Sequence, residues 1–378
     1  MKADASHKSI RILTAVPICD GHDSAINTIN LELIRHAGIE IIYLGYHRSV
    51  LDIVRAAIQE DVRAVGLSSY NGGHIEFFSA VVEGLRRRGA GDIGVFGGGG
   101  GTISRADAKI MMRRGVDRIF FAGTPLDEMS AFVREKYGGS RKVRSKTKLS
   151  DPDRVLARKL TGIESGAGGR LRRRVTPSSR GDKPLVIGIT GPGGAGKTTL
   201  IDELVLRTLA ARPDARIGIL SHDPSLLGAG ALLGDRATMI YSQDDRVFMR
   251  SFATRGESGG LSAHTRRCID AMRGFEILFV ETVGIGQEAA PFQQGEVDRI
   301  VFVMSPEYGS RLQLQKIVML DAADVVVVNK SDLAGAKTAQ AEVEHRLRSN
   351  QRGQCVLCTT ASRHGDAGVD ELLRVVMG

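Results

Sequence analysis

Residues 185–198 read LVIGITGPGGAGKT, and this stretch decides the fold of the C-terminal half of the chain. Its first six residues have the apolar character of a buried strand, and the pattern G-x-x-x-x-G-K-[ST] follows directly. Glycines leave backbone N–H groups bare to cradle phosphate oxygens at the start of a helix, which we expect over 199–209. The stretch therefore predicts a P-loop nucleotide-binding domain with a mostly parallel sheet.

The residues of this loop are expected to act on the nucleotide in different ways. Lys197 is expected to reach the β and γ phosphates as a catalytic residue, and the hydroxyl of Thr198 to bind Mg²⁺. The residues that we expect at the nucleotide are Gly191, Gly193, Gly194, Ala195, Gly196, Lys197, Thr198 and Thr199.

A second element, Asn329-Lys330-Ser331-Asp332, follows the apolar run 325–328. It resembles the guanine-reading element of G proteins, in which a carboxylate accepts hydrogen bonds from the ring N–H and the exocyclic amine. Adenine offers no such pair of donors, so Asp332 favours GTP and GDP over ATP. Asn329 and Lys330 are expected to contact the nucleotide as well.

Three carboxylates are candidate ligands of Mg²⁺, a cation that prefers oxygen ligands and retains some of its waters. Asp223 follows the apolar run 217–220, and Glu281 ends the run 277–280 in the pattern E-x-x-G. Asp235 is a third candidate. Glu281 is also expected to be catalytic. A surface carboxylate is the alternative interpretation of each.

The N-terminal half alternates apolar, strand-like runs with amphipathic, helix-like runs. Five such units in about 130 residues predict an α/β fold with a parallel, doubly wound, flavodoxin-like sheet. Its ligand crevice should open beyond the carboxyl ends of the first and third strands. We expect strands at Arg11–Pro17, Ile39–Leu44, Ala64–Ser68, Ile93–Phe96 and Arg118–Phe121, and helices at Ser24–His36, Val50–Gln59, His74–Arg88, Ser104–Arg114 and Pro125–Lys136.

Polar and glycine-rich loops follow these strands. His22 lies between Asp20 and Asp23 after the first strand, where a carboxylate can orient one imidazole nitrogen while the other faces a metal. Glycines fill all five positions of 97–101, which lets a flat or bulky ligand approach the backbone. A solvated loop histidine and a flexible glycine loop are the alternative interpretations.

The net charge of the chain is concentrated in one stretch. Residues 140–183 hold 14 Lys or Arg and 4 Asp or Glu, a net charge of +10 in a chain whose total is +9. We therefore predict a basic linker with a docking helix between a domain at 8–139 and a domain at 184–378. Because both domains are nearly neutral and the charges are not interleaved with aromatic residues, no nucleic-acid partner is expected. A basic handle for an acidic partner or for phosphates is the alternative to a solvated spacer.

The composition also limits the cellular compartments in which we expect this protein. No run approaches the ~18 apolar residues of a membrane span, and residues 1–9 lack the apolar stretch of a secretory signal. The 4 cysteines are too few and too scattered for a disulfide framework. We expect a cytoplasmic protein without a membrane partner, and we interpret Cys355-x-x-Cys358 as part of a strand rather than as a metal or redox site.

The N-terminal loops resemble the cobalamin-binding module of acyl-CoA mutases over residues 8–139. That family has the signature Asp-x-His-x-x-Gly, Ser-x-Leu and Gly-Gly, and this chain has Asp20-Gly21-His22, Ser68-x-Tyr70 and Gly97-Gly98. It departs at Ala25 and Tyr70, in a manner similar to the isobutyryl-CoA mutase branch. The resemblance implies that His22 is the lower axial cobalt ligand of adenosylcobalamin, oriented by Asp20. It also implies that the nucleotide tail of the cofactor binds beside Ser68, Tyr70, Gly97 and Gly98.

Residues 151–375 resemble the G-protein chaperones of methylmalonyl-CoA mutase and the G domain of fused isobutyryl-CoA mutase. The motifs that carry this resemblance lie at 222–225, 230–236, 280–287 and 305–309. The resemblance implies a first switch within 223–236, a second within 281–290 and a third within 305–316 that senses the mutase. It further implies base contacts from Thr360 and Ala361. Lys316 would be a catalytic residue supplied on activation, with an exposed helical lysine as the alternative.

A complete fused mutase would continue into a (β/α)₈ barrel of about 250 residues or more. We therefore expect a GTP-hydrolysing chaperone joined to a cobalamin module, which loads or repairs the cofactor of an acyl-CoA mutase whose barrel is on another chain or missing from this fragment. The mutase large subunit is the expected partner, and cobalamin adenosyltransferase and a second copy of this chain are further candidates. The alternatives are a corrinoid carrier or sensor with a regulatory GTPase, and a flavodoxin-like receiver or flavin module in the N-terminal half.

Overall fold

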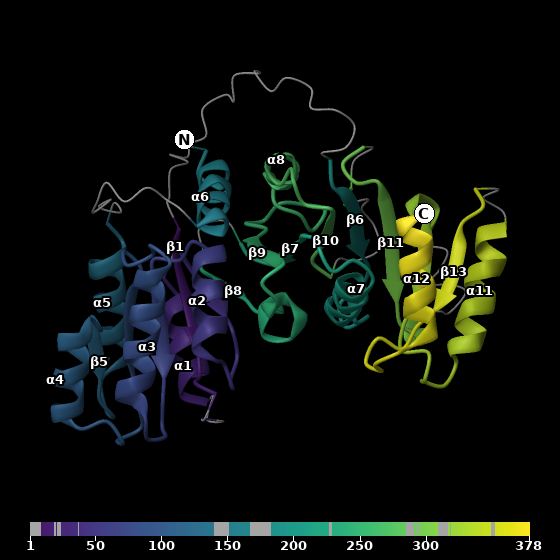
Figure 1. Ribbon diagram of the computed structural model, residues 1–378. Coiled ribbons are helices and arrows are strands. Elements are labelled where there is room, and N and C mark those ends of the chain that lie inside the picture. Colours follow the sequence, from purple (N-terminus) through teal and green to yellow (C-terminus); the bar gives the residue numbers. More distant parts are fainter. Residues whose placement is uncertain are drawn as a thin grey trace, which may run out of the picture. The chain divides into compact units, whose positions relative to one another are not determined.

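The computed structural model describes residues 9–18, 20, 24–36, 38–139, 151–166, 183–226, 229–284, 291–292, 295–308, 317, 319–348 and 352–378. These residues form two compact units, one within Met1–Arg173 together with Ser225–Ala237 and one within Arg174–Pro224 and Thr238–Gly378 (Figure 1). His22, Lys316, residues 285–290 of the expected second switch and residues 309–316 of the expected third switch lie outside the described residues.

A parallel sheet of six strands forms the centre of the first unit. Its order is β5-β4-β3-β1-β2-β8, so the direction of strand addition reverses between β1 and β3. This order confirms the predicted flavodoxin-like fold, with one additional strand beside β2. The strands are β1 (Ile10–Ala15), β2 (Ile39–Tyr43), β3 (Ala64–Ser68), β4 (Gly94–Gly98), β5 (Arg118–Phe120) and β8 (Ala231–Leu233). The helices are α1 (Ser24–Ile34), α2 (Val50–Gln59), α3 (His74–Arg87), α4 (Arg105–Arg114), α5 (Leu126–Tyr137) and α6 (Pro152–Glu164).

Serine caps set where two of these helices begin. The hydroxyl of Ser49 accepts a hydrogen bond from the N–H of Asp52 at the start of α2, and the Asp52 carboxylate accepts from the N–H of Ser49. Ser104 and Asp107 form the same capping box at α4. These boxes satisfy N–H groups that have no partner within their own helix.

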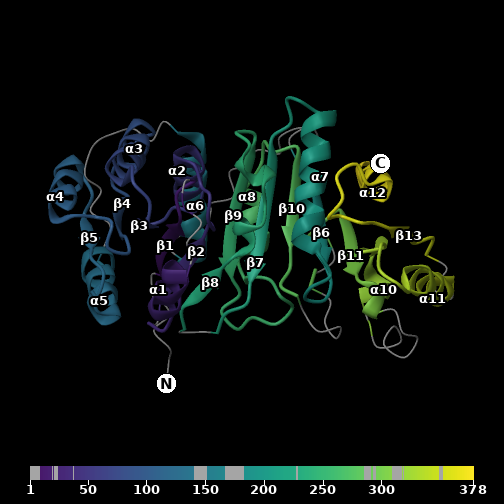
Figure 2. The same cartoon turned by 90° about the horizontal axis from the view of Figure 1, so that it is seen from below.

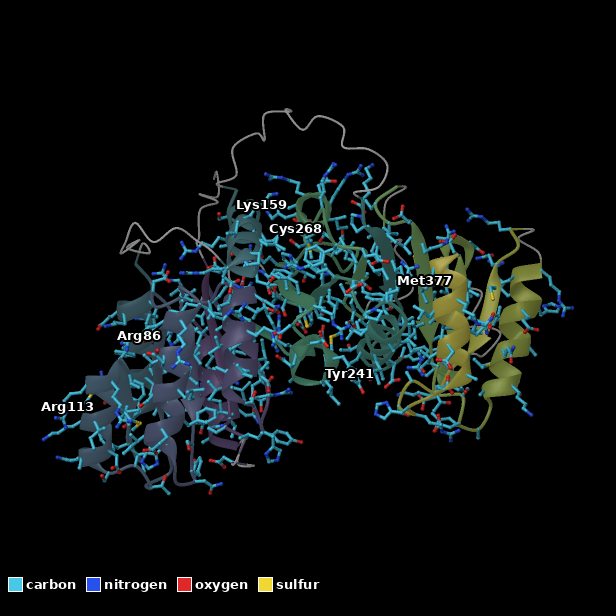
Figure 3. All side chains as sticks on the ribbon, in the orientation of Figure 1. Arg86, Arg113, Lys159, Tyr241, Cys268 and Met377 are labelled. Atoms are coloured by element: carbon cyan, nitrogen blue, oxygen red, sulfur yellow. The ribbon has the colours of Figure 1, made fainter. Side chains whose placement is uncertain are left out.

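The helices of the first unit bury apolar side chains, such as Ile53 of α2 and Leu85 of α3. The charged residues Arg86 in α3, Arg113 in α4 and Lys159 in α6, which Figure 3 labels, are exposed. Such a division of apolar and charged faces is the pattern from which the helices were predicted.

The basic linker contains a helix, α6, as its Asp-Pro-Asp start predicts. Asp151 caps this helix by accepting a hydrogen bond from the N–H of Arg154, and Pro152 occupies the first turn. The helix packs against α2 in the first unit. The guanidinium of Arg154 is buried there in an ion pair with Asp92. Part of the charge of the linker is therefore neutralised inside the first unit rather than left in solvent.

A second parallel sheet, in the order β13-β12-β11-β6-β10-β7-β9, forms the centre of the second unit. Strands β9 and β11 are not among those expected from the sequence. The strands are β6 (Leu185–Thr190), β7 (Ile217–Asp223), β9 (Val247–Ala253), β10 (Ile277–Glu281), β11 (Arg299–Met304), β12 (Val325–Val328) and β13 (Cys355–Cys358). The helices are α7 (Lys197–Ala211), α8 (Thr265–Ala271), α10 (Met319–Ala322), α11 (Ala336–Arg348) and α12 (Ala367–Met377), with 3-10 turns η2 (Tyr241–Gln243) and η3 (Pro306–Tyr308).

Strand β8 reaches the first sheet from the other half of the chain. The chain leaves the second unit after Pro224, contributes β8 and the turn η1 (Asp235–Ala237) to the first unit, and returns at Thr238. Figure 2 shows β8 beside β2. The sequence predicts this stretch only as part of a GTPase switch.

A buried ionic cluster joins β1, β2 and the end of α2. The guanidinium of Arg11 pairs with Glu40 at 2.9 Å and with Glu60 at 2.6 Å, and all three side chains are buried. Burial by itself would lower the pKa of Arg11, but the nearby carboxylates outweigh burial and raise this pKa overall. Arg11 therefore stays charged inside the unit.

We predict that Arg11→Met lowers the free energy of unfolding of the first unit by about 3–5 kcal/mol, because it removes the guanidinium that pairs with the buried carboxylates of Glu40 and Glu60. Chemical denaturation followed by circular dichroism measures this loss. The matched control is Arg35→Met, which removes a pair with Glu32 from a guanidinium side chain that is 75% exposed, and should cost about 0–1 kcal/mol. Equal losses in the two variants would contradict the role of the cluster.

Candidate functional site

Three glycines of the P loop have left-handed backbone conformations that other residues rarely adopt. The φ angles of Gly191, Gly194 and Gly196 are 143°, 75° and 88°. A Cβ atom on Gly191 would lie 1.9 Å from the carbonyl oxygen of Val303, so this position also requires glycine for space. At Gly194 no atom of the described residues, apart from its chain neighbours, lies within 4 Å of such a Cβ. The loop thus follows the path that a phosphate cradle needs.

Two polar side chains at the start of α7 are held beside this loop. Lys197 is buried, and its Nζ donates a hydrogen bond to the carbonyl oxygen of Pro192 at 3.2 Å. The hydroxyl of Thr198 donates to Oε1 of Glu281 at 2.7 Å. Glu281 ends β10, which pairs with β6 and so brings this carboxylate next to the loop that follows β6.

The Thr198 hydroxyl and the Glu281 carboxylate provide oxygen atoms, which are the ligands that Mg²⁺ prefers. Asp223 ends β7, the neighbour of β10 on its other side, and is partly buried. Within the described ranges, no three His, Cys, Asp or Glu side chains come together as a metal-ligating group. Proteins commonly hold Mg²⁺ through one or two carboxylates while phosphates and water complete the set. Asp235 lies in η1 and belongs to the first unit.

Asn329 connects the phosphate loop to the base loop. Its Nδ2 donates to the carbonyl oxygen of Ala195 at 2.8 Å, and its Oδ1 accepts from the Thr359 hydroxyl at 2.9 Å and from the Ala361 N–H at 3.1 Å. Asn329 is buried, so each of these bonds replaces one that water would otherwise make. The side chain therefore positions two loops relative to each other.

The remaining residues of the base element surround this connection. Lys330 is exposed and has a left-handed backbone with φ of 57°, and Asp332 is exposed two residues later. The hydroxyls of Ser331 and Thr360 share a hydrogen bond of 2.9 Å. The structure thus brings Asn329, Thr360 and Ala361 together, while the base contacts of Lys330, Asp332, Thr360 and Ala361 stay predictions.

His222 is a residue of this region that the sequence analysis gave no role. It is buried on β7, where its Nδ1 lies 2.8 Å from the backbone oxygen of Glu281 and its Nε2 lies 2.8 Å from the Thr265 hydroxyl. Its ring stacks on Phe252 with centroids 5.3 Å apart. Burial lowers the pKa of His222 to about 4, so the imidazole is neutral and bridges β10 to α8.

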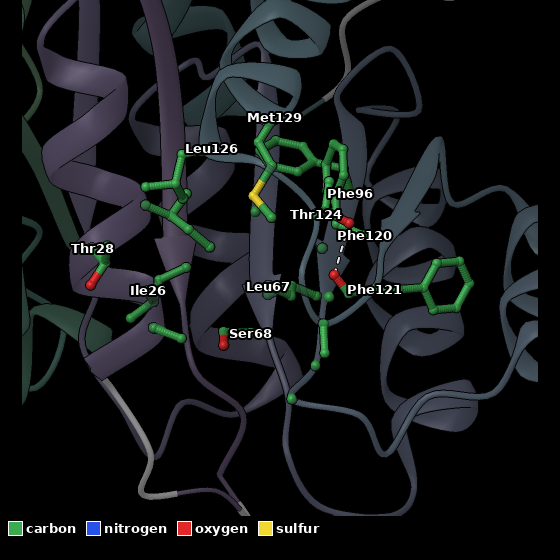
Figure 4. Close-up of a pocket in the computed structure, with 18 of the residues that line it drawn as sticks. Ile26, Thr28, Leu67, Ser68, Phe96, Phe120, Phe121, Thr124, Leu126 and Met129 are labelled. Carbon is green, nitrogen blue, oxygen red and sulfur yellow. Dashed lines mark hydrogen bonds between the residues drawn. The ribbon is translucent and has the colours of Figure 1, made fainter.

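The first unit has a cavity at the reversal between β1 and β3, where the topology predicts a ligand. Its volume is about 370 Å³, within the range of small-molecule sites. Figure 4 shows Ser68 among its lining residues, with Leu67 and Phe96 on neighbouring strands. Gly97 and Gly98 at the end of β4 also line it. The cavity wall is mostly apolar and glycine, which suits a large organic group.

Two details at this cavity fit the predicted cofactor. The Thr14 hydroxyl lines the cavity, is buried, and has no hydrogen-bond partner among the described residues. Asp20 is buried, and its carboxylate accepts a hydrogen bond from the N–H of Tyr70. This bond joins the loop after β1 to the loop after β3. A Cβ on Gly100 would lie 1.8 Å from the Tyr70 ring, so the glycine run also makes room for this ring.

Two family models match the chain, one over each half. The model of the "Methylmalonyl Co-A mutase-associated GTPase MeaB" matches residues 156–377. The chain belongs to this GTPase family. The model of the B12 binding domain matches residues 10–128, so in this member of the MeaB family a B12-binding domain precedes the GTPase.

Similar proteins include longer chains. A fused isobutyryl-CoA mutase from Cupriavidus metallidurans is 37% identical over 392 residues, which cover 98% of this chain and 35% of that protein. The mitochondrial methylmalonic aciduria type A homolog of Mus musculus is 35% identical over 180 residues, or 45% of this chain and 42% of that protein. The solved structure of HypB from Helicobacter pylori in complex with nickel has a TM-score of 0.39 at 15% identity and covers 51% of this chain and 86% of its own. This MeaB-family chain thus spans about a third of the length of the fused mutases that it matches.

Two further observations on this family member concern membrane-spanning helices and the reactivity of its cysteines. None of the helices in the described ranges has both the length and the apolar character that crossing a membrane requires. Cys355 and Cys358 lie on β13, as expected, and the Cys358 thiol donates to Oε1 of Gln340 at 3.1 Å. Burial raises the pKa of both thiols, which disfavours the reactive thiolate.

We predict that His222 makes the GTPase unit sensitive to acid. The pKa of this group is about 4 in the folded protein, below its ordinary 6.5, so unfolded chains bind the proton first as the pH falls. The stabilisation is present above pH 6.5 and is lost as the pH approaches 4, with a loss of about 2 kcal/mol between pH 7 and pH 5. Urea denaturation at both pH values measures it.

The variant His222→Asn should show a smaller loss over the same pH interval, because it has no imidazole to titrate. The exposed His345→Asn on α11 is the matched control and should lose as much as the natural protein. Equal pH dependence in all three proteins would rule out this role of His222.

Proposed function

We propose that this chain is a GTP-hydrolysing chaperone whose N-terminal domain carries adenosylcobalamin. It would load or repair the cofactor of an acyl-CoA mutase of the isobutyryl-CoA mutase kind. The observation that carries the proposal is that one chain combines the two arrangements on which these sites would be built. Asn329 ties a phosphate loop to a base loop in one unit, and a cavity lies at the strand-order reversal in the other.

The P loop and its neighbours would bind and hydrolyse GTP. In this proposal, backbone N–H groups of the loop and the buried Lys197 hold the phosphates, while Asp332 accepts the two donors of guanine. The Mg²⁺ ligands would be Thr198, Asp223, Asp235 and Glu281. When bound, Mg²⁺ supplies positive charge that balances the phosphates during transfer. Lys316 would be a further catalytic residue supplied on activation.

The cavity of the first unit would take the nucleotide tail of the cofactor, and His22 would bind the cobalt. Asp20 would orient His22, and the hydrogen bond that its buried carboxylate accepts from the N–H of Tyr70 supports a fixed position for this carboxylate. When bound, adenosylcobalamin supplies the radical chemistry of the mutase. Ser68, Tyr70, Gly97 and Gly98 would contact the tail.

The partner of this chaperone would be the substrate-binding barrel of the mutase. Support comes from the relatives named fused isobutyryl-CoA mutase, of which this chain matches about a third. We propose that the barrel lies on a separate chain or in a longer form of this polypeptide. GTP binding and hydrolysis would then shift a switch that admits or releases the cofactor.

We predict that the purified protein changes the visible spectrum of adenosylcobalamin to that of a base-off, histidine-ligated form. His22→Ala should abolish this change, because it removes the imidazole that would bind the cobalt. His345→Ala removes an exposed histidine on α11 and should leave it intact. An unchanged spectrum with both the natural protein and His22→Ala would refute the cobalt assignment.

We predict that Asp332→Asn weakens GTP binding by at least about 100-fold, because an amide cannot accept both donors of guanine. The same variant should bind xanthosine triphosphate better than the natural protein does, since an amide N–H can donate to the oxygen that replaces the exocyclic amine. Titration of the natural protein and of Asp332→Asn with both nucleotides measures the change in their relative affinities. Asp214→Asn, at an exposed aspartate before β7, is the control, and retained GTP preference in Asp332→Asn would refute the guanine assignment.

A further inference from the structure

We call residues Gly230–Ala237 the shared segment. In the sequence they lie between elements of the GTPase unit, but they pack within the first unit. The segment follows β7, whose last residue is the proposed Mg²⁺ ligand Asp223, and precedes η2; both of these elements are in the GTPase unit. The segment itself forms β8 and η1 within the first unit. It is therefore a short covalent path between the nucleotide site and the cobalamin-binding sheet.

Backbone pairing and close packing fix the shared segment on the edge of this sheet. Strand β8 is parallel to β2, with Ile41 opposite Leu232 and Ile42 opposite Leu233 (Figure 2). Leu233 is fully buried. A Cβ atom on Gly230 would lie 2.2 Å from the backbone oxygen of Ile34 at the end of α1. The segment can therefore lie here only with glycine at this position.

A buried charge anchors the other end of the segment. The guanidinium of Arg236 pairs with Oε1 of Glu60 at 3.1 Å and donates to Oε1 of Gln59 at 3.2 Å, and the side chains of Arg236 and Glu60 are 0% exposed. The same carboxylate of Glu60 binds Arg11, which binds Glu40 on β2. Arg236 thus completes the ionic cluster that joins β1, β2 and α2. A buried pair of this kind has two distinct states, made or broken, rather than a continuous range.

The first unit keeps a complete flavodoxin-like sheet without the segment. Strands β1 to β5 already have the order that this fold requires, and β8 is added at the edge beyond β2. Glu60 would still pair with Arg11 if Arg236 left. The strand order of the flavodoxin-like fold therefore does not depend on the segment.

We propose that the shared segment couples the two sites: its docking on β2 differs between the GDP and GTP states of the protein, so that nucleotide binding changes the cobalamin affinity of the first unit. This inference rests on the proposed function. Strand β2 lies next to β1, whose loop carries Asp20, so a change at the sheet edge reaches the crevice across one strand. By linkage, cobalamin would change the affinity for GTP by the same factor.

Two glycines of the segment provide a matched pair of variants. Gly230→Ala places its Cβ against the Ile34 backbone and should displace the segment. In Gly234→Ala the new Cβ meets no atom of the described part of the chain within 4 Å, its chain neighbours apart, and should not displace it. Arg236→Met is a second displacing variant, which removes the buried charge but retains an unbranched side chain. Circular dichroism and binding of each ligand alone establish that every variant is folded.

The experiment measures amide hydrogen exchange of the full chain over 229–237 and 39–43, with GDP and with a non-hydrolysable GTP analogue. It also measures adenosylcobalamin affinity in both states. We expect exchange in these two stretches to differ between the nucleotides in the natural protein and in Gly234→Ala. Cobalamin affinity in these proteins should differ by at least about fivefold between the nucleotides. In Gly230→Ala and Arg236→Met, exchange should be fast in both states and the affinity ratio should fall to about one.

Two results would overturn the coupling while leaving the proposed function in place. The first is a natural protein that binds both ligands but has the same exchange and the same cobalamin affinity with either nucleotide. The second is a displaced segment in Gly230→Ala or Arg236→Met with an unchanged affinity ratio. A natural protein that binds neither ligand alone would instead refute the proposed function, and the coupling with it.

Discussion

Parallel strand pairing is the constraint on which both sites depend. Every strand pairing of the two sheets is parallel among the described residues, so within each unit the carboxyl ends of the strands lie along one edge. In the first unit this edge collects the loops after β1, β3 and β4, and in the second it collects the loops after β6, β7, β10 and β12. Residues far apart in the sequence meet there because the sheet brings them together. Asn329 and Ala195 are an example, separated by 134 positions and joined by a hydrogen bond of 2.8 Å.

The same constraint explains how much could be predicted from the sequence. Strands with a strong apolar run, such as 64–68, 185–190 and 325–328, were predicted with the bounds that the structure has. The P loop was predicted because its glycines are local requirements of φ angle and space. The crevice was predicted because the order of the first five strands follows from five β-α units.

Other features depend on distant partners that no local pattern reveals. Strand β8 has three residues, and it forms only because β2, about 190 positions earlier in the chain, offers an edge. Nothing in the local sequence distinguishes the buried Arg236 from an ordinary charged residue, because its partner Glu60 lies 176 positions away. His222 was passed over for the same reason, since its bonds to Glu281 and Thr265 cross from β7 to β10 and α8. His22 and Lys316 lie outside the described residues, so their roles stay predictions.

The central claim is that one chain of the MeaB family binds a guanine nucleotide and a cobalamin at separate sites. Native mass spectrometry of the full chain with Mg²⁺, a non-hydrolysable GTP analogue and adenosylcobalamin tests it most directly. The account predicts a species that carries one nucleotide and one cobalamin on the same chain. It is contradicted if the two ligands exclude each other, or if cobalamin never remains bound.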